Sequence, residues 1–460
     1  MRDRLSRTAV LAVLLLGGCN LAPPYEQPMA PIPGAYPEPP LATGRQASDV
    51  AWENFFGDPQ LKAYMAAALG NNRDLSAATA RIAQAQAQFR IQQANRLPQV
   101  DAAVSGSRTR VPTPAGANTS ELYAAQIGVT SFEIDFWGRL ANLSEAARGQ
   151  YLATVEAQRA FRLTLIRNVA SVYYGIRSGE EAIALVERTL ETRRHGREIA
   201  RLRLEAGVTS GVDFDQASIL VTQAEAQLAD LQRTTQQQRH LLMVLVGGPV
   251  TAPLPPGRGI ADAGQFATLD PGLPSSLLLN RPDIQAAEQQ LRAANANIGA
   301  ARASYLPFIA LTATGGYVSP ELASLFNSGS QTWSYGLAAA LPLFDWGRRR
   351  ALVDQSRARQ EELAANYQRA IQEAFREVSD GLVARRRLEE QIRAQEQAVA
   401  AQRDLAEIAD LRYDNGVSIY LEVLDAERSL LAAEQQLILL RAASLQNGAA
   451  LYTALGGGAD

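Results

Sequence analysis

Residues 131–140 read Ser-Phe-Glu-Ile-Asp-Phe-Trp-Gly-Arg-Leu, and they close a stretch of alternating side chains just before a very long helical pattern. Residues 340–350 read Ala-Leu-Pro-Leu-Phe-Asp-Trp-Gly-Arg-Arg-Arg and stand at the same kind of junction. The tryptophans of the two stretches, Trp137 and Trp346, are 209 positions apart (346 − 137). This spacing recurs along most of the chain, which indicates an internal duplication.

The duplication keeps one register. A shift of 209 residues aligns identical residues throughout: Asp74 with Asp283, Leu97-Pro98 with Leu306-Pro307, Gly138-Arg139 with Gly347-Arg348, Gly207-Val208 with Gly416-Val417, and Gly247 with Gly456. A repeat of about 185 residues is far too long for a solenoid. The sequence therefore predicts a first repeat over 51–248, a Pro-rich linker over 249–276 and a second repeat over 277–460.

Composition narrows the class of protein. Aromatic residues make up only 7% of the chain, which favours long, narrow helical seams over one large globular core. The formal net charge of −3 argues against nucleic acid as a partner. His195 and His240 are isolated, and the sequence contains no nucleophile-base set, phosphate-binding loop or cluster of metal ligands. We expect no catalytic residues, no metal site and no cofactor.

The N-terminus has the pattern of a secreted lipoprotein. A basic start and a short apolar run over 1–18 predict a signal peptide. The sequence Leu-Gly-Gly-Cys at 16–19 resembles the bacterial lipobox, in which the cysteine is lipidated, and Cys19 is the only cysteine of the chain. An ordinary signal peptide with an incidental cysteine is the alternative. The many prolines that follow predict an extended, lipid-anchored tether over 19–50 without a packed core.

Each repeat is expected to contain one β-hairpin. A helix from Asp74, a plausible N-cap, is followed by a hairpin over about 99–133, and the second copy places its hairpin over about 308–342. Strands of this length fit a tilted transmembrane β-strand of about 9 to 11 residues, although a soluble hairpin has the same pattern. Because four strands cannot close a barrel in lipid, strands that enter a membrane require an oligomer, and a trimer with twelve strands is the smallest that leaves a lumen.

Each repeat continues as a helical strut, over about 138–246 in the first copy and about 347–455 in the second. In each strut a helix of some 67 residues is followed by a glycine turn and a returning helix. Residues Ser178 and Gly179 mark a possible kink in the first long helix.

These features resemble the TolC-type outer-membrane efflux protein family, in its lipoprotein branch of outer membrane factors. The resemblance runs from about Trp52 to Gly456 and rests on the following motifs: Cys19 with the Pro-rich segment after it, Asn280-Arg281-Pro282-Asp283-Ile284, the run Ile298 to Pro307, and Pro342-Leu343-Phe344-Asp345-Trp346-Gly347-Arg348. It implies a mainly α fold with a small transmembrane β part. In the family, three chains form one twelve-stranded β-barrel in the bacterial outer membrane and a helical barrel that extends into the periplasm.

The resemblance also implies partners and a function. The homotrimer would be the exit duct of a tripartite efflux system. It would meet a periplasmic adaptor (membrane fusion) protein and an inner-membrane pump of the RND type, and it would catalyse nothing. Two alternatives remain open: the outer-membrane component of a type I protein secretion system, and a lipid-anchored periplasmic coiled-coil scaffold without a pore.

Several residues near the two glycine turns are candidate site residues. Glu422 and Asp425 share one helix face, and in a trimer they would form rings of carboxylates that select cations; the alternative is that acids favour the first turn of any helix. The resemblance places the contacts that close the channel on Asp213 and Tyr413. The family's latching arginine falls on Ser418, so Arg203 or Arg412 would have to replace it. The adaptor would bind the turns, at Gly207, Val208, Gly416 and Val417.

Overall fold

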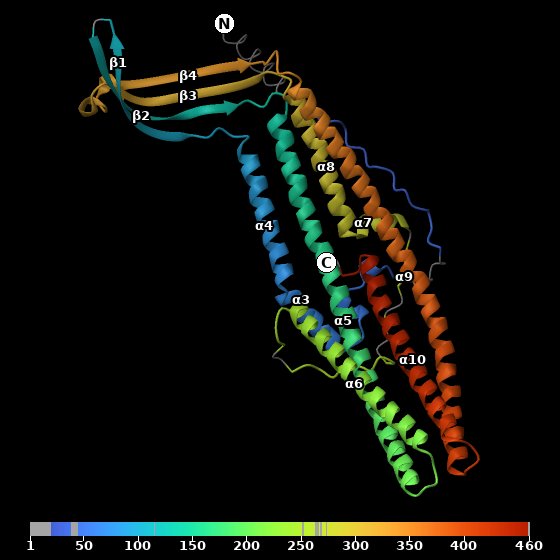
Figure 1. The fold of residues 1–460 in the computed structure, drawn as a ribbon. Coiled ribbons are helices and arrows are strands. Elements are labelled where there is room, and N and C mark those ends of the chain that lie inside the picture. Colours follow the sequence, from blue (N-terminus) through green and yellow to red (C-terminus); the bar gives the residue numbers. More distant parts are fainter. Residues whose placement is uncertain are drawn as a thin grey trace. The chain divides into compact units, whose positions relative to one another are not determined.

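The computed structural model describes residues 20–37, 45–114, 116–250, 253–262, 266, 269–272 and 274–458. The expected signal peptide and Cys19 lie outside these residues. Figure 1 shows helices, with a few strands, in this order: η1 Ala47–Asp49, α2 Trp52–Phe55, α3 Pro59–Asn71, α4 Arg73–Ala94, β1 Asp101–Thr113, β2 Gly116–Glu133, α5 Arg139–Glu205, α6 Gly211–Val246, η2 Pro274–Ser276, α7 Leu277–Asn280, α8 Pro282–Ala303, β3 Phe308–Ser319, η3 Leu322–Ser324, η4 Ser328–Ser330, β4 Gln331–Ala340, α9 Arg348–Asp414 and α10 Tyr420–Ala454. The predicted fold class, mainly α with a small β part, is confirmed.

The chain forms two compact units. Unit 1 comprises residues 1–29, 81–155 and 286–369, and unit 2 comprises residues 30–80, 156–285 and 370–460. One boundary between them lies between residues 29 and 30, and the other four fall inside α4, α5, α8 and α9. None of the helices in the described part of the chain is both long and apolar enough to cross a membrane.

Unit 1 contains one antiparallel sheet with the strand order β1-β2-β3-β4. The two hairpins join through β2 and β3, and a bulge between Val129 and Phe132 shifts their register by one residue. β1 and β4 are the edges of the sheet, and no strand of the described part of the chain lies beside their outer backbone groups. The side chains on β4 are strongly exposed, with Trp333 at 73% and Tyr335 at 77%. The sheet is therefore open at both edges and carries exposed aromatic side chains.

The helices of unit 1 pack through small residues. Ala146 of α5 forms a buried cluster with Ala293 and Ala296 of α8. A Cβ atom on Gly149 of α5 would lie 3.0 Å from the Cβ of Ala293, so the two helices approach closely there. Alanine and glycine at these positions let α5 and α8 pack with little space between their backbones.

The start of the segment predicted to be an extended tether makes hydrogen bonds to unit 1. The Asn142 amide donates to Asn20 Oδ1 at 2.9 Å, and the Asn295 amide donates to the Pro23 carbonyl at 2.8 Å. Further along, the Gln27 amide donates to the Tyr367 hydroxyl at 2.7 Å. The prolines do exclude helix and strand over 20–37, as expected. The segment lies against unit 1, because its polar groups form hydrogen bonds with α5, α8 and α9.

The core of unit 2 is aromatic. Phe55 stacks on Tyr452 with ring centroids 4.2 Å apart and on Phe266 at 5.1 Å. Beside these rings lies a fully buried carboxylate, Asp58, which caps α3 by accepting from the backbone N–H of Gln60 at 2.8 Å. The Tyr173 hydroxyl donates to the same carboxylate at 2.7 Å. A buried charge is tolerated here because several donors satisfy it.

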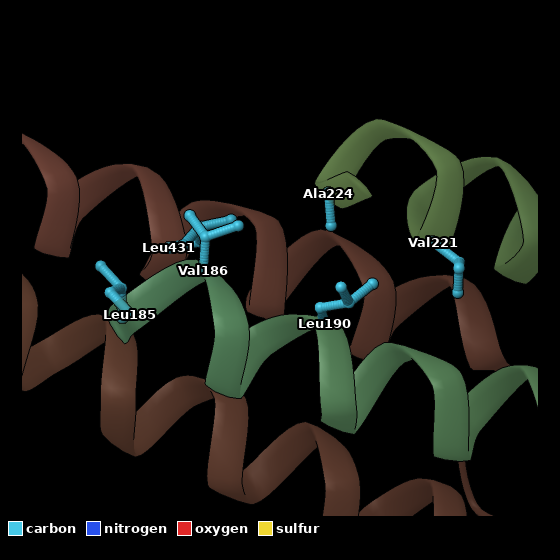
Figure 2. Packing of buried hydrophobic residues seen from close by; sticks show 6 residues of the cluster. All are labelled: Leu185, Val186, Leu190, Val221, Ala224 and Leu431. Atoms are coloured by element: carbon cyan, nitrogen blue, oxygen red, sulfur yellow. The ribbon is translucent and has the colours of Figure 1, made fainter. Parts of the chain in front are cut away.

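The helices α5, α6 and α10 share a second hydrophobic cluster in unit 2 (Figure 2). Its residues are Leu185, Val186 and Leu190 of α5, Val221 and Ala224 of α6, and Leu431 of α10. Where α5 passes Thr235 of α6, a Cβ on Gly179 would lie only 2.1 Å from the threonine Oγ1. α5 runs unbroken through this point. Gly179 therefore permits close packing and does not interrupt the helix.

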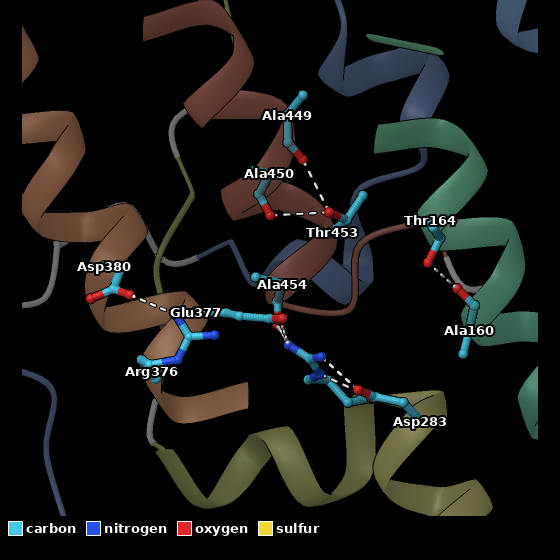
Figure 3. A network of polar contacts seen from close by, with 11 residues as sticks. Ala160, Thr164, Asp283, Arg376, Glu377, Asp380, Ala449, Ala450, Thr453 and Ala454 are labelled. Atoms are coloured by element: carbon cyan, nitrogen blue, oxygen red, sulfur yellow. Dashed lines mark hydrogen bonds and ion pairs between the residues drawn. The ribbon is translucent and has the colours of Figure 1, made fainter. Parts of the chain in front are cut away.

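Arg281 joins three helices of unit 2. Its buried guanidinium donates to Asp283 at the start of α8, at 2.6 Å, and to Glu377 of α9, at 2.7 Å. It also donates to the carbonyl of Ala454 at the end of α10, at 3.1 Å (Figure 3). Cations stabilise the carbonyl end of a helix. The Asn-Arg-Pro-Asp sequence thus has a structural role in linking α8, α9 and α10.

One predicted helix start is wrong by two residues. Asp74 was expected to cap its helix, but α4 begins at Arg73 and Asp74 lies in its first turn. The Asn72 side chain accepts from the backbone N–H of Leu75 at 2.8 Å and is the cap. Asn and Asp are about equally good caps, so the choice depends on where the chain leaves α3.

Candidate functional site: the two turns of unit 2

Both long helices end in the same turn. After α5, the Val208 N–H donates to the Arg203 carbonyl and the Gly207 N–H to the Leu204 carbonyl, both at 3.0 Å. After α9, the corresponding bonds join Val417 to Arg412 and Gly416 to Tyr413, both at 2.9 Å. This pattern with glycine in the left-handed region is the Schellman motif, and Gly207 and Gly416 have φ of +72° and +69°.

The turns expose apolar side chains. Val208 is 72% exposed and Val417 is 69% exposed. We call the two turns and their flanks, residues 203–213 and 412–428, the turn region. Ala406 and Ala409 of α9 pack on Val423 and Ala426 of α10 beneath the second turn. The second turn is thus supported by packed side chains, and the valines of both turns are exposed to contact with another molecule.

An arginine connects the two long helices at the turn region. The Arg203 guanidinium at the end of α5 lies 4.6 Å from the ring centre of Tyr413 at the end of α9 and donates to its hydroxyl. Asp213, expected to share in the closing contacts, instead accepts from Thr209 of its own turn. Ser418 Oγ is buried without a hydrogen-bond partner. Of the two arginines considered for the latch, Arg203 is the one that contacts Tyr413.

The two candidate constriction residues have arginine partners. Glu422 lies 3.3 Å from Arg412, and Asp425 lies 2.8 Å from Arg428. Both carboxylates are about half exposed, so water screens these pairs strongly. The side chains stand three positions apart on α10, on one side of the helix. The structure therefore places two accessible acids on the first turns of α10.

A buried charge cluster next to the turn region was missed in the sequence. Arg193 of α5 is 6% exposed and donates to the Leu220 carbonyl of α6 at 3.1 Å, while its Nε has no partner. Burial raises the pKa of Glu427 on α10, nearby Asp410 of α9 raises it further, and Arg193 partly offsets both. The signal was available: Arg193 and Glu427 fall on the apolar faces of their helices.

Within the described residues, no three His, Cys, Asp or Glu side chains come together as a metal site would require. The site that remains is a protein surface with two exposed turns, an inter-helix latch and a pair of accessible carboxylates. Such a surface is suited to contacts with other chains and with passing ions.

Comparison with known proteins supports the assignment of a family. The profile of the "Outer membrane efflux protein" family matches residues 65–248 and 273–457. The chain is 41% identical to the probable efflux pump outer membrane protein TtgC of Pseudomonas putida, covering 100% of this chain and 96% of the relative. It is 38% identical to the cation efflux system protein CusC of Escherichia coli, covering 97% of each.

A solved structure is also similar. The open state of the Neisseria gonorrhoeae MtrE outer membrane channel superposes with a TM-score of 0.89 at 36% identity, covering 96% of this chain and 99% of that one. The chain belongs to the outer membrane efflux protein family. It is an outer-membrane channel protein of an efflux system, and the expected resemblance, function class and outer-membrane location are confirmed.

Proposed function

We propose that three copies of this chain form the exit duct of a tripartite efflux system driven by an inner-membrane pump of the RND type. The supporting observation is the four-stranded sheet, which is open at both edges and exposes Trp333 and Tyr335. Strands of 10 to 18 residues are long enough to cross the outer membrane. Since lipid does not tolerate an open edge, several chains have to close the sheet together.

The turn region is the proposed contact with the rest of the pump. A periplasmic adaptor would bind Gly207, Val208, Gly416 and Val417, because the glycine turns are well supported and their valines are exposed. The contact of Arg203 with Tyr413 would latch the closed state. It would replace the family's latching arginine, whose position is occupied here by Ser418. Asp213 would assist by holding its own turn through Thr209.

The duct would be passive. It would bind no cofactor, catalyse no reaction and take its energy from its partners. Cys19 would carry the lipid that adds membrane affinity. We also propose that the chain is two copies of one unit, 51–248 and 277–460; the family profile matches twice, and the Schellman turns recur 209 residues apart, which supports this division.

The carboxylates of Glu422 and Asp425 would form the cation-selective constriction. In a planar bilayer, we expect the purified trimer to give small steps of current that favour cations, because rings of acids attract cations and repel anions. The double variant Glu422→Gln with Asp425→Asn should lose most of this preference. The exposed pair Glu198→Gln and Glu205→Gln on α5 serves as a charge-matched control.

Either of two results would contradict the proposal. A monomer in detergent without conductance would favour a scaffold without a pore. A conducting trimer whose selectivity is the same in the wild type and the double variant would leave the channel intact and return Glu422 and Asp425 to the role of acids that stabilise a helix start.

A further inference from the structure

One corner of unit 1 is held by a tryptophan. At the end of β2, the Trp137 indole Nε1 donates to the carbonyl of Pro307, the residue that precedes β3, at 2.9 Å. Beside it, the Ile134 N–H donates to the Ile309 carbonyl at 2.9 Å and extends the pairing of the two strands. The corner that follows β2 is thereby fixed to the corner that precedes the neighbouring strand.

Among the residues that the structure describes, the twin tryptophan has no such acceptor. Trp346 is 94% exposed, and its ring contacts only Phe344, edge to face, with centroids 5.8 Å apart. Its φ of +56° makes it the one residue other than glycine with a positive φ in the described part of the chain. This region is unusual for a bulky side chain. The second Trp-Gly-Arg corner thus presents an indole donor to its surroundings.

The acceptor corner is also duplicated. Before Pro307, the Tyr305 and Leu306 N–H groups donate to the carbonyls three residues earlier, at 3.1 Å each. Before Pro98, the Arg96 and Leu97 N–H groups make the same two bonds at 3.1 and 2.9 Å. Pro98 is exposed and immediately precedes the region of β1. The chain therefore contains a second donor corner, after β4, and a second acceptor corner, before β1.

The sheet order separates these two corners within one chain. β2 lies beside β3, but β1 and β4 are the opposite edges of the sheet. We propose that the Trp346 indole donates to the Pro98 carbonyl of the partner subunit, and that β4 pairs there with the partner's β1 as β2 pairs with β3. This inference rests on the proposed oligomer and specifies its contact. The duplicated chain then uses the same kind of donor and acceptor, a tryptophan indole and the carbonyl of a proline, both within a subunit and between subunits.

The internal pairing fixes the register between subunits. Beyond the bulge, Phe132 pairs with Leu311, and the shift of 209 converts this pair into Leu341 with Ala102 of the partner subunit. Internally, the bulge falls at the next step, because Ala313 pairs with Val129. β4 pairs with β3 without any bulge. If β4 stays regular against the partner as well, Ala339 pairs with Val104 of the partner subunit. The two side chains also lie on the same face of the sheet. Val104 pairs with Ala125, Ala125 with Tyr317, and Tyr317 with Gln331, so Val104 and Gln331 share one face. Ala339 shares that face because it lies eight residues after Gln331 on β4. An offset of one residue would place the two side chains on opposite faces.

Disulfide trapping tests the register. The variant with Ala339→Cys and Val104→Cys should give cross-linked chains under mild oxidation, because directly paired residues lie within the distance that a disulfide spans. The control combines Ala339→Cys with Ala103→Cys, whose side chain points to the other face. The wild-type protein, whose only cysteine is Cys19, serves as the control for cross-links that form through Cys19. A trimer that links through the control pair, or through neither pair, overturns the proposed register, whereas a monomeric protein overturns the proposed oligomer itself.

Trp346→Phe tests the hydrogen bond. Phenylalanine retains an aromatic ring and removes the donor, so the trimer should dissociate more readily, by about fivefold in the dissociation constant per interface. Subunit folding, followed by circular dichroism of the dissociated chains, should be unchanged. Trp137→Phe is the matched variant. It removes the hydrogen bond within a subunit, so it should lower the folding stability of the subunit and leave trimer dissociation unchanged. Trimer dissociation that is equal in wild type and Trp346→Phe would overturn the role of Trp346.

Discussion

Single arginines determine which parts of the turn region touch. The sequence identified Tyr413 as a contact and left Arg203 and Arg412 as alternatives, and the structure brings Arg203 onto the tyrosine ring while Arg412 lies beside Glu422. The sequence could not separate these alternatives. Both arginines end a long helix, and only the packing of α5 on α9 decides which guanidinium reaches the ring.

The partly buried carboxyl of Glu427 leads to a prediction about pH. Its pKa is raised in the folded chain by burial and by Asp410, with Arg193 acting in the opposite direction. A raised folded pKa means that the folded state binds this proton more tightly than the unfolded state does. Stability from this group is therefore present at low pH and is lost as the pH rises through the raised pKa.

Replacing Glu427 by Gln should remove this dependence. At neutral pH, where burial and Asp410 disfavour the ionised carboxyl of Glu427, we expect the variant to unfold at a higher temperature in circular dichroism. The difference should shrink as the pH falls below the raised pKa. Exposed Glu225, paired with Arg194 on the surface, is the control for Glu→Gln. If Glu427→Gln lowers the unfolding temperature at neutral pH, the attraction of Arg193 outweighs the burial of the carboxylate.

At the scale of elements, the periodicity of apolar residues and the positions of proline and glycine predicted most of the helices and strands. The hairpin expected over about 308–342 and the observed β3 and β4, Phe308–Ser319 and Gln331–Ala340, differ at their ends by a residue or two. Proline and glycine account for this agreement, because they set backbone geometry locally. The purpose of Gly179 was not predictable in this way, since it depends on a neighbouring helix. The spacing of Gly175 and Gly179, one helical turn apart, was the available signal.

The approach of α5 to α6 yields an element-scale prediction. Gly179→Ala should destabilise unit 2 by about 1 to 3 kcal/mol, despite the better helix propensity of alanine, because its Cβ would overlap Thr235 Oγ1. Adding Thr235→Ala removes that oxygen and should recover part of the loss in a double-mutant cycle. Gly70→Ala in α3, which meets nothing within 4 Å, should be stabilising by about 0.5 to 1 kcal/mol. Denaturant unfolding measures the stability of Gly179→Ala, Thr235→Ala, their combination and Gly70→Ala. If the stability changes at 179 and 235 simply add in the double variant, the overlap of the two side chains is refuted.

For the molecule as a whole, the internal repeat was the most informative feature of the sequence. It predicted one architecture twice, and the two Schellman turns are nearly identical in their bonds. The repeat could not predict where the copies differ. Gly299 of the second copy corresponds to Arg90 of the first, and a Cβ at Gly299 would lie 2.7 Å from the Ala22 backbone nitrogen. Only the second copy therefore has room for the N-terminal segment, and the repeat pattern gave no sign of this contact.

The hydrogen bonds of the N-terminal segment suggest that lipid anchoring at Cys19 and assembly of the trimer can be tested separately. Asn20, Pro23 and Gln27 are held by hydrogen bonds to helices of unit 1, and none of these bonds involves a lipid. Cys19→Ser should therefore abolish labelling by radioactive fatty acid and leave the trimer mass in detergent unchanged. Gly299→Leu is the complementary variant: it should retain the label while making residues 20–29 accessible to protease. A Cys19→Ser protein that is unlabelled and monomeric would show that the lipid, rather than this segment and the sheet edges, is needed for assembly.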